Sequence, residues 1–207
     1  MLHYKTVYPE TLELLKELSA SPELSDFFLV GGTAVSLHVG HRISVDLDFF
    51  SQKDINTDSL KLLLSSRYSI HNTITDVNTL SCIIKYKGTS IKVEFISYKY
   101  DLLRPVVNID GINLLELDDL IPMKLSAISG RGAKKDFCDI YFLLQKFSIT
   151  QMLELYRQKF ETENIFHLIK SLTFFDLADN DPEPIMLNRV EWSKIKKRFI
   201  KEIKLIS

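Results

Sequence analysis

Cysteine, glycine and proline are scarce in this sequence of 207 residues. The two cysteines, Cys82 and Cys138, stand far apart in separate apolar segments, so they form neither a metal-ligand set nor a disulfide framework. We expect both to be buried free thiols, as suits a reducing cytoplasm. With only 7 glycines and 6 prolines, long disordered linkers are not expected. The 45% hydrophobic and 26% charged residues are typical of a globular protein.

Long apolar runs are absent as well. No run approaches the roughly 20 residues that cross a bilayer, and residues 1–18 lack the apolar core and cleavage site of a signal peptide. We therefore expect a cytoplasmic protein without membrane contact. The formal net charge of −1 excludes the strongly basic composition of a nucleic-acid coat protein, although it allows a local basic groove.

The spacing of apolar residues predicts a mixed α/β half up to about residue 115 and a helical half after it. The expected elements of the first half are, in order, an amphipathic helix carrying Leu12, Leu15 and Leu18, a strand at 27–30, a helix at 34–40, a strand at 43–50, a helix at 58–68, and hairpin strands at 79–87 and 90–98. One or two short strands should follow. Pro122 should lie near the start of the next helix, where proline is tolerated.

Two aspartates interrupt the expected strand "ISVDLDFF" at residues 43–50. Aspartate is uncommon in strands because its side chain competes for backbone hydrogen bonds. Since side chains alternate along a strand, Ser44, Asp46 and Asp48 should share one face. The two aspartates would then lie about 7 Å apart at Cα, from a rise near 3.3 Å per residue. Such carboxylates can converge on a pair of metal ions.

A third acidic residue, Glu94, stands inside the apolar segment "SIKVEFISY". A buried glutamate is costly unless it is paired. If its strand lies beside the Asp46–Asp48 strand, Glu94 completes a three-carboxylate site. Like charges so close would raise one another's pKa values, and a divalent cation removes that conflict. Oxygen ligands favour Mg²⁺ or Mn²⁺. The alternative for Glu94 is a simple ion pair with a lysine.

A "GGT" turn joins the strand at 27–30 to the helix at 34–40. Gly31 and Gly32 let the backbone approach a ligand closely, and the free N–H groups at a helix start favour phosphate. Thr33 should cap the helix or contact a phosphate oxygen. The alternative is that this Gly-Gly pair is only a turn.

The order of these features resembles the nucleotidyltransferase fold of the polymerase β type. More narrowly, "VGGTAVSLHVGHRISVDLDFF" resembles the AbiEii/MenT family of nucleotidyltransferase toxins. A second block of that family has a lysine, an arginine and then "KD-x-x-D". Here "MKLSAISGRGAKKDFCDIYFLL" supplies these residues as Lys124, Arg131, Lys135, Asp136 and Asp139. The likeness runs from about residue 27 to about residue 200. Two departures are Glu94 in place of aspartate, and Pro122, which could shift Lys124.

The resemblance implies an α+β fold: a small mixed sheet flanked by helices, followed by a helical C-terminal region. Residues 1–115 would be the nucleotidyltransferase catalytic core, and residues 116–207 would complete the active-site cleft. The implied catalytic residues are Asp46, Asp48, Glu94, Lys124 and Asp136. The implied metal ligands are Asp46, Asp48 and Glu94. The implied nucleotide-binding residues are Gly31, Gly32, Thr33, Ser44, Lys124, Arg131 and Asp139.

Several of these residues have a plainer interpretation. Lys124 could be a solvated lysine, and Asp136 could simply charge a helix start. Arg42 could pair with an active-site carboxylate or with a helix end. His38 and His41 have no partners at metal-ligand spacing, which favours structural roles. The lysine-rich final helix around Trp192 has either a solvated outer face or a groove for RNA phosphates.

The function implied by the resemblance is metal-dependent transfer of a nucleoside monophosphate from an NTP to an acceptor, with release of pyrophosphate. The acceptor would be a tRNA 3′ end, and the protein would be the toxin of a toxin–antitoxin pair with a cognate antitoxin protein as partner. Nucleotidylation of a protein or small molecule is one alternative. A non-catalytic nucleotide-binding or interaction protein is another, although the intact carboxylate and lysine set argues against it.

Overall fold

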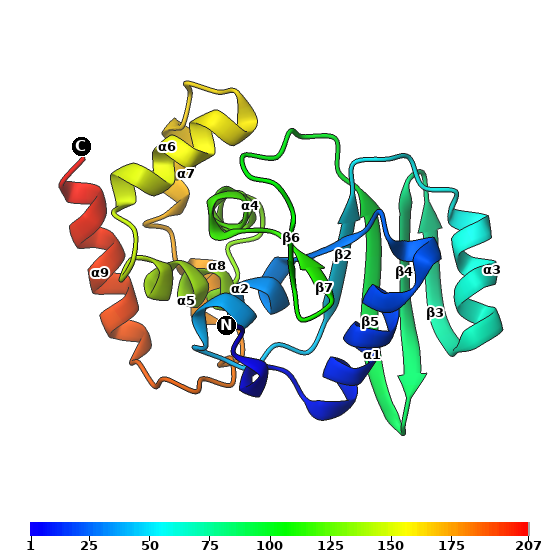
Figure 1. The fold of residues 1–207 in the computed structure, drawn as a ribbon. Helices are drawn as coiled ribbons and strands as arrows, with labels where there is room; N and C mark the ends of the chain where they lie inside the picture. The colour runs from blue at the N-terminus through cyan, green and yellow to red at the C-terminus, as the bar shows by residue number, and fades with distance from the viewer. Residues whose placement is uncertain (207) are drawn as a thin grey trace.

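Within residues 1–206, the part of the chain that the computed structural model describes, a seven-stranded mixed sheet has the order β3-β4-β5-β2-β1-β7-β6. Its strands are β1 (Phe28–Val30), β2 (Leu47–Ser51), β3 (Ser69–Asp76), β4 (Thr79–Tyr86), β5 (Thr89–Ser97), β6 (Val107–Ile109) and β7 (Ile112–Leu114). Helices flank the sheet and continue as a separate layer beyond it (Figure 1). This arrangement confirms the expected fold class.

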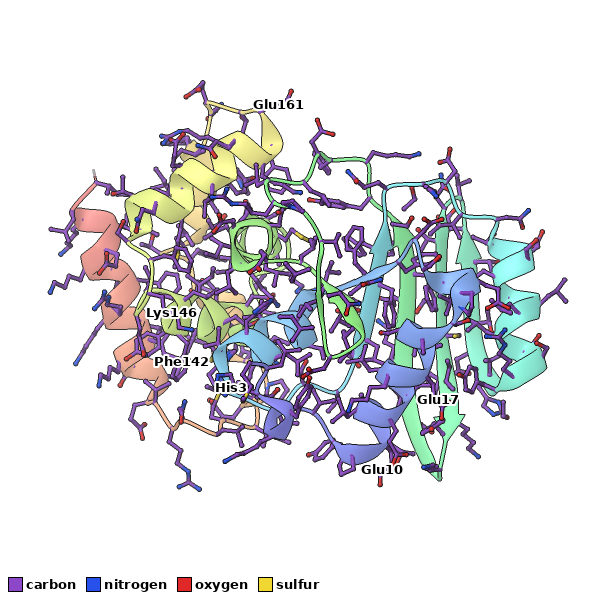
Figure 2. The ribbon with its side chains drawn as sticks, in the orientation of Figure 1. His3, Glu10, Glu17, Phe142, Lys146 and Glu161 are labelled. Atoms are coloured by element: carbon purple, nitrogen blue, oxygen red, sulfur yellow. The ribbon has the colours of Figure 1, made fainter. Side chains whose placement is uncertain are left out.

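The helices are α1 (Pro9–Ala20), α2 (Gly31–Val39), α3 (Thr57–Arg67), α4 (Leu117–Gly130), α5 (Lys134–Leu143), α6 (Ile149–Phe160), α7 (Phe166–Ser171), α8 (Asp176–Asp179) and α9 (Trp192–Lys204). Two short 3-10 turns lie at Tyr4–Thr6 and Pro22–Leu24. Helix α1 packs against β4 and β7, and α3 packs against β3 and β4. Figure 2 shows Glu17 on α1, where its carboxylate accepts a hydrogen bond from the Tyr86 hydroxyl of β4.

The centre of the sheet joins the two segments that carry the predicted carboxylates. Strand β2 pairs with β1 in antiparallel and with β5 in parallel register. Asp48 is opposite Val30 on one side and Glu94 on the other. The expected neighbourhood of the two acidic strands is therefore confirmed.

Strand β2 begins at Leu47 rather than at residue 43, so Asp46 precedes the strand. The preceding residues pair elsewhere. The Ile43 N–H donates to the Ile185 carbonyl at 2.8 Å, and the Ser44 N–H donates to the Thr6 carbonyl at 2.8 Å. Both partners lie outside the sheet, Thr6 in the 3-10 turn and Ile185 in a loop, so apolar alternation alone predicts too long a strand.

Two other expectations are wrong at the ends of helices. Helix α2 begins at Gly31 and not at residue 34, so Val30 rather than Thr33 holds the N-cap position. Pro122 lies at the sixth residue of α4, beyond the first turn, yet the helix continues through it to Gly130. Strand β3 was not expected, because it is a largely exposed edge strand without an apolar face.

The helical layer is organised around α4, which contacts α2, α5, α6 and α7. Helix α9 lies at the outer edge, where Ile195, Phe199 and Ile203 are buried (Figure 1). Phe199 packs on Phe137 of α5, with ring centroids 5.2 Å apart. Figure 2 marks the end of α5 by Phe142 and Lys146. The hydrophobic core is continuous from the sheet into this layer.

Both cysteines are buried free thiols, as expected. Burial raises the pKa of Cys82 to about 11 and, as the largest cause, that of Cys138 to about 12. Both thiols are therefore expected to be protonated at neutral pH. No helix within residues 1–206 combines the length and apolar character needed to cross a bilayer.

Candidate active site

A cavity of about 300 Å³ lies where the β1–α2 turn, β2, β5 and α4 meet. Its polar lining residues are Gly31, Gly32, Arg42, Ser44, Asp46, Asp48, Lys92, Glu94, Lys124, Arg131 and Lys135. Its apolar lining residues are Val30, Phe50, Ile96, Leu120, Met123 and Ala127. Of the predicted site residues, only Thr33, Asp136 and Asp139 do not line it. The cavity draws on both the mixed and the helical half of the chain.

The two glycines allow the start of α2 to approach the aspartates closely. Gly31 has φ +68, and a Cβ there would overlap the Asp48 carboxylate. A Cβ on Gly32 would lie 2.6 Å from Arg42 Nη2. The first N–H groups of α2 have no partner within the helix, as at any helix start. They are suited to bind an anion in the cavity.

Thr33 contributes structure rather than an exposed hydroxyl. Its side chain is fully buried. The hydroxyl donates to the backbone carbonyl of Asp46 and lies 2.9 Å from the Ser44 hydroxyl. Thr33 thus fastens the segment before β2 to α2, and its hydroxyl is already used within the protein. Ser44 is buried by the same contact but still lines the cavity.

Asp48 lies in an unbalanced acidic environment. Burial, followed by the charges of Glu94 and Asp46, raises the pKa of the Asp48 carboxyl to about 6. Lys124 and Lys92 act in the opposite direction without cancelling the shift. A bound cation would remove this conflict.

Glu94 is paired with Lys92, the partner that the plainer interpretation requires, at 2.9 Å. Within residues 1–206 no three His, Cys, Asp or Glu side chains are gathered closely enough to form a metal-binding group. The donor chemistry nevertheless fits Mg²⁺, because Asp46, Asp48 and Glu94 line one cavity with oxygen ligands only. The raised pKa of Asp48, caused first by burial and then by Glu94 and Asp46, is consistent with this donor set.

Lys124 is not a solvated lysine. Its side chain is only 6% exposed, and its Nζ lies 3.0 Å from Asp136 Oδ1 and 2.8 Å from Asp139 Oδ2. Burial opposes the charge on Lys124, but Asp139 and Asp136 raise its pKa above the ordinary value. The lysine is therefore a fixed cation at the cavity wall, and Pro122 does not displace it.

Asp139 joins residues from both sequence blocks. Arg42 Nε and Nη2 donate to its two oxygens at 2.6 and 2.9 Å, and His41 Nε2 lies 2.7 Å from Oδ1. Burial alone would raise the pKa of Asp139, but Arg42 and Lys124 hold it well below the usual range. Arg42 thus pairs with this carboxylate and not with Asp46 or Asp48.

Asp136 holds Arg131 as well as Lys124. Arg131 donates to Asp136 from Nε at 2.8 Å and from Nη2 at 2.9 Å, while its side chain remains 57% exposed. Asp136 and Asp139 are both fully buried and do not line the cavity, and each contacts cations that do line it.

Sequence reasoning missed Lys92, Phe50 and Ile96 as cavity residues. A simple signal was available for all three. Phe50 follows Asp48 by two positions, and Lys92 and Ile96 stand two positions on either side of Glu94, so each shares a strand face with its acidic neighbour. His41 is buried with a structural partner, as favoured from the sequence, and the His38 ring nitrogen Nε2 lies 2.8 Å from the Leu115 carbonyl oxygen.

The family model described as nucleotidyl transferase AbiEii toxin, type IV toxin–antitoxin system, matches residues 13–205. An uncharacterized protein of Aquifex aeolicus (strain VF5) is 31% identical over 209 residues, which cover 94% of this chain and 95% of that protein.

Two solved structures share the fold. JHP933 from Helicobacter pylori is 20% identical with a TM-score of 0.58, over 97% of this chain and 93% of its own. The nucleotidyltransferase toxin MenT4 from Mycobacterium tuberculosis H37Rv is 12% identical with a TM-score of 0.59, over 95% of this chain and 86% of its own. Because the family match spans nearly the whole sequence, this chain belongs to the AbiEii family of nucleotidyltransferase toxins.

Proposed function

We propose that this nucleotidyltransferase moves a nucleoside monophosphate from an NTP to the 3′ end of a tRNA in a Mg²⁺-dependent reaction that releases pyrophosphate. It would act as the toxin of a pair whose antitoxin protein restrains it, in the cytoplasm where NTPs and tRNAs are found. One observation carries the proposal: a single cavity combines a glycine turn at a helix start, three carboxylates and fixed cations.

The triphosphate would bind at the end of the cavity formed by Gly32 and Arg131, which we call the cationic end. The N–H groups of Gly31 and Gly32 would hold phosphate oxygens, and the exposed guanidinium of Arg131 would add a charge-assisted contact. Lys124 is held at the wall by two carboxylates, so it can meet developing charge without reorganising.

Asp46, Asp48 and Glu94 would hold Mg²⁺, which neutralises charge on phosphate oxygens when bound. Glu94 is partly open to solvent, since its side chain is 28% exposed and that of its ion-pair partner Lys92 is 49% exposed. A carboxylate at this position can accept the proton of the incoming hydroxyl at its oxygen. Release of Lys92 from Glu94 would accompany binding.

The tRNA acceptor rests on the family resemblance, and the basic helix α9 does not add to it. None of the residues of α9 lines the cavity, and Lys196 and Arg198 pair with Asp179 and Glu202. A protein or small-molecule acceptor would use the same site with a different approach surface.

The test is incubation of total tRNA with each of the four α-labelled NTPs and Mg²⁺. The negative control is an Asp46→Ala, Asp48→Ala double variant, and the matched control is Asp58→Ala, which removes an exposed carboxylate of α3. Label on tRNA with wild type and Asp58→Ala, but not with the double variant, supports the proposal and names the base. Label on protein only, or no transfer with any NTP, contradicts it.

A further inference from the structure

A row of aromatic rings leads from the cavity to the surface. Phe50 lines the cavity and lies 5.0 Å from the Tyr98 ring, centroid to centroid. Tyr98 lies 5.1 Å from Tyr100, which in turn lies 5.1 Å from Phe160 at the end of α6. Tyr100 is 51% exposed. We refer to Phe50, Tyr98, Tyr100 and Phe160 as the aromatic row.

The loop between β5 and β6, which carries Tyr100, is held by hydrogen bonds from side chains of α4 and α6. Asp119 of α4 accepts hydrogen bonds at 2.9 Å from the backbone N–H groups of Leu103 and Arg104. Lys159 of α6 donates at 2.6 Å both to Asp119 and to the Asp101 carbonyl. In Figure 1 this loop rises between the sheet and α6, and Figure 2 marks the end of α6 by Glu161.

The Asp119–Lys159 ion pair is fully buried and lines no part of the cavity. Burying such a pair costs desolvation energy, so it is weak evidence for stability alone. Its geometric effect is clear, because it holds three backbone groups of an otherwise irregular loop. Lys159 Nζ also lies 5.0 Å from the centroid of the Tyr98 ring. The aromatic row is therefore held in place before any ligand binds.

The cavity has a cationic end and an apolar end. Along β2, Asp48 precedes Phe50 on the same face, and along the parallel strand β5, Glu94 precedes Ile96. Leu120 lies near the start of helix α4 and Arg131 directly follows its end, so these two lining residues are at opposite ends of the helix. The carboxylates thus lie between the end formed by Gly32 and Arg131 and the end formed by Phe50, Ile96 and Leu120.

Phosphoryl and nucleotidyl groups are transferred in line, with the attacking and leaving oxygens on opposite sides of the phosphorus. If pyrophosphate leaves at the cationic end, the acceptor hydroxyl must arrive from the apolar end, where the aromatic row begins. Aromatic rings at this entrance suit a partner that presents flat faces. Unpaired nucleobases stack on such rings with little regard to sequence.

We infer that the aromatic row binds the acceptor, by stacking the unpaired bases that precede the 3′ hydroxyl of a single-stranded RNA end. This inference rests on the proposed function and adds the surface that recognises the acceptor. Lys99 and Arg104 of the same loop form exposed ion pairs with Asp54 and Asp118, so the proposal rests on the rings and not on these cations. Tyr100 is the exposed member of the aromatic row.

The test compares Tyr100→Leu with Tyr100→Phe, which keeps the ring. The matched control is Tyr8→Leu, since Tyr8 is 41% exposed and does not line the cavity. Binding of a fluorescein-labelled single-stranded RNA with a free 3′ hydroxyl is measured by anisotropy without NTP. NTP affinity is measured separately by equilibrium dialysis, and KM for the RNA by label transfer.

We expect Tyr100→Leu to weaken RNA binding and raise KM for RNA roughly tenfold, while Tyr100→Phe, Tyr8→Leu and NTP affinity stay unchanged. RNA labelling by wild type with an unchanged KM in Tyr100→Leu overturns the inference and leaves the proposed function standing. An equal loss of NTP affinity also overturns it, because the row would then hold the incoming base. No binding or labelling of RNA by wild type overturns both.

Discussion

At the scale of single residues, Asp48 shows what the acidic cluster costs. Its folded-state pKa of about 6 lies above the ordinary value of 3.8. Between these two pH values the folded chain holds a proton that the unfolded chain releases. Stability therefore falls as the pH rises through this window and stays low above it.

Asp48→Asn removes this loss of stability. We expect the variant to exceed wild type in unfolding free energy at pH 7 by on the order of 3 kcal/mol without metal, from a shift of about two pKa units. The difference should shrink as the pH falls to 3.8. Chemical denaturation at several pH values checks this, and nucleotidyl transfer by the variant should be lost. Equal stability of both proteins at pH 7 would show that Asp48 is solvated.

Asp139 has the opposite role, because it holds two buried cations. We expect Asp139→Asn to lose about 3 kcal/mol of unfolding free energy, since Arg42 and Lys124 would keep their buried charges without it. The depressed pKa means that wild type loses this contribution only in strong acid.

The matched control for Asp139→Asn is Asp26→Asn, which breaks an ion pair with Lys53 whose side chains are 53% and 71% exposed. Exposed pairs of this kind contribute about 1 kcal/mol or less. Urea denaturation of both variants decides the matter, and similar losses in the two would contradict a special role for Asp139.

At the scale of elements, the sequence predicted the strands with apolar faces. Alternation placed the acidic residues on faces of their own strands, but that Asp48 and Glu94 lie on neighbouring strands was only a condition of the prediction, which the structure meets. Alternation missed strand β3, which lies at the sheet edge and is held by backbone pairing to β4. It also extended β2 too far before Leu47, where Ile43 and Ser44 hydrogen-bond to Ile185 and Thr6 outside the sheet.

The partner of Arg42 could not be identified from the sequence, because it comes from a distant part of the chain. Arg42 and Asp139 are 97 positions apart, and only the packing of α5 against α2 brings them together. The sequence shows that Arg42 and Asp139 are charged, but it does not predict that they lie in contact.

The turn into α2 allows a test with a matched pair of glycines. Gly31 and Gly88 both have positive φ, so alanine should cost each about 1 kcal/mol in backbone strain. Only at Gly31 would the new Cβ overlap Asp48; around Gly88 the space is open. We expect Gly31→Ala to lose NTP and Mg²⁺ binding while Gly88→Ala keeps both, measured by calorimetry. Loss of binding in both variants would point to a general loss of folding.

At the scale of the whole molecule, the division at residue 115 remains a prediction. The cavity takes Leu120, Met123 and Lys124 from beyond that point, and the hydrophobic core continues across it. We expect a fragment of residues 1–115 to bind NTP far more weakly than the full chain, because it lacks one wall of the cavity. Equilibrium dialysis of both proteins tests this, and equal affinities would show that the first half is a complete nucleotide-binding domain.

The shared carboxylate of Asp139 also bears on how such a protein can change over time. His41 and Arg42 open the segment that leads to Asp46 and Asp48, the proposed metal ligands, and Asp139 belongs to the second motif nearly a hundred positions later. If the Arg42 or the Asp139 side chain is replaced alone, the charge of the remaining residue stays buried without its partner. A chimera whose two motifs do not supply a matching arginine and aspartate should therefore lose stability. The two distant stretches of the gene are expected to change together.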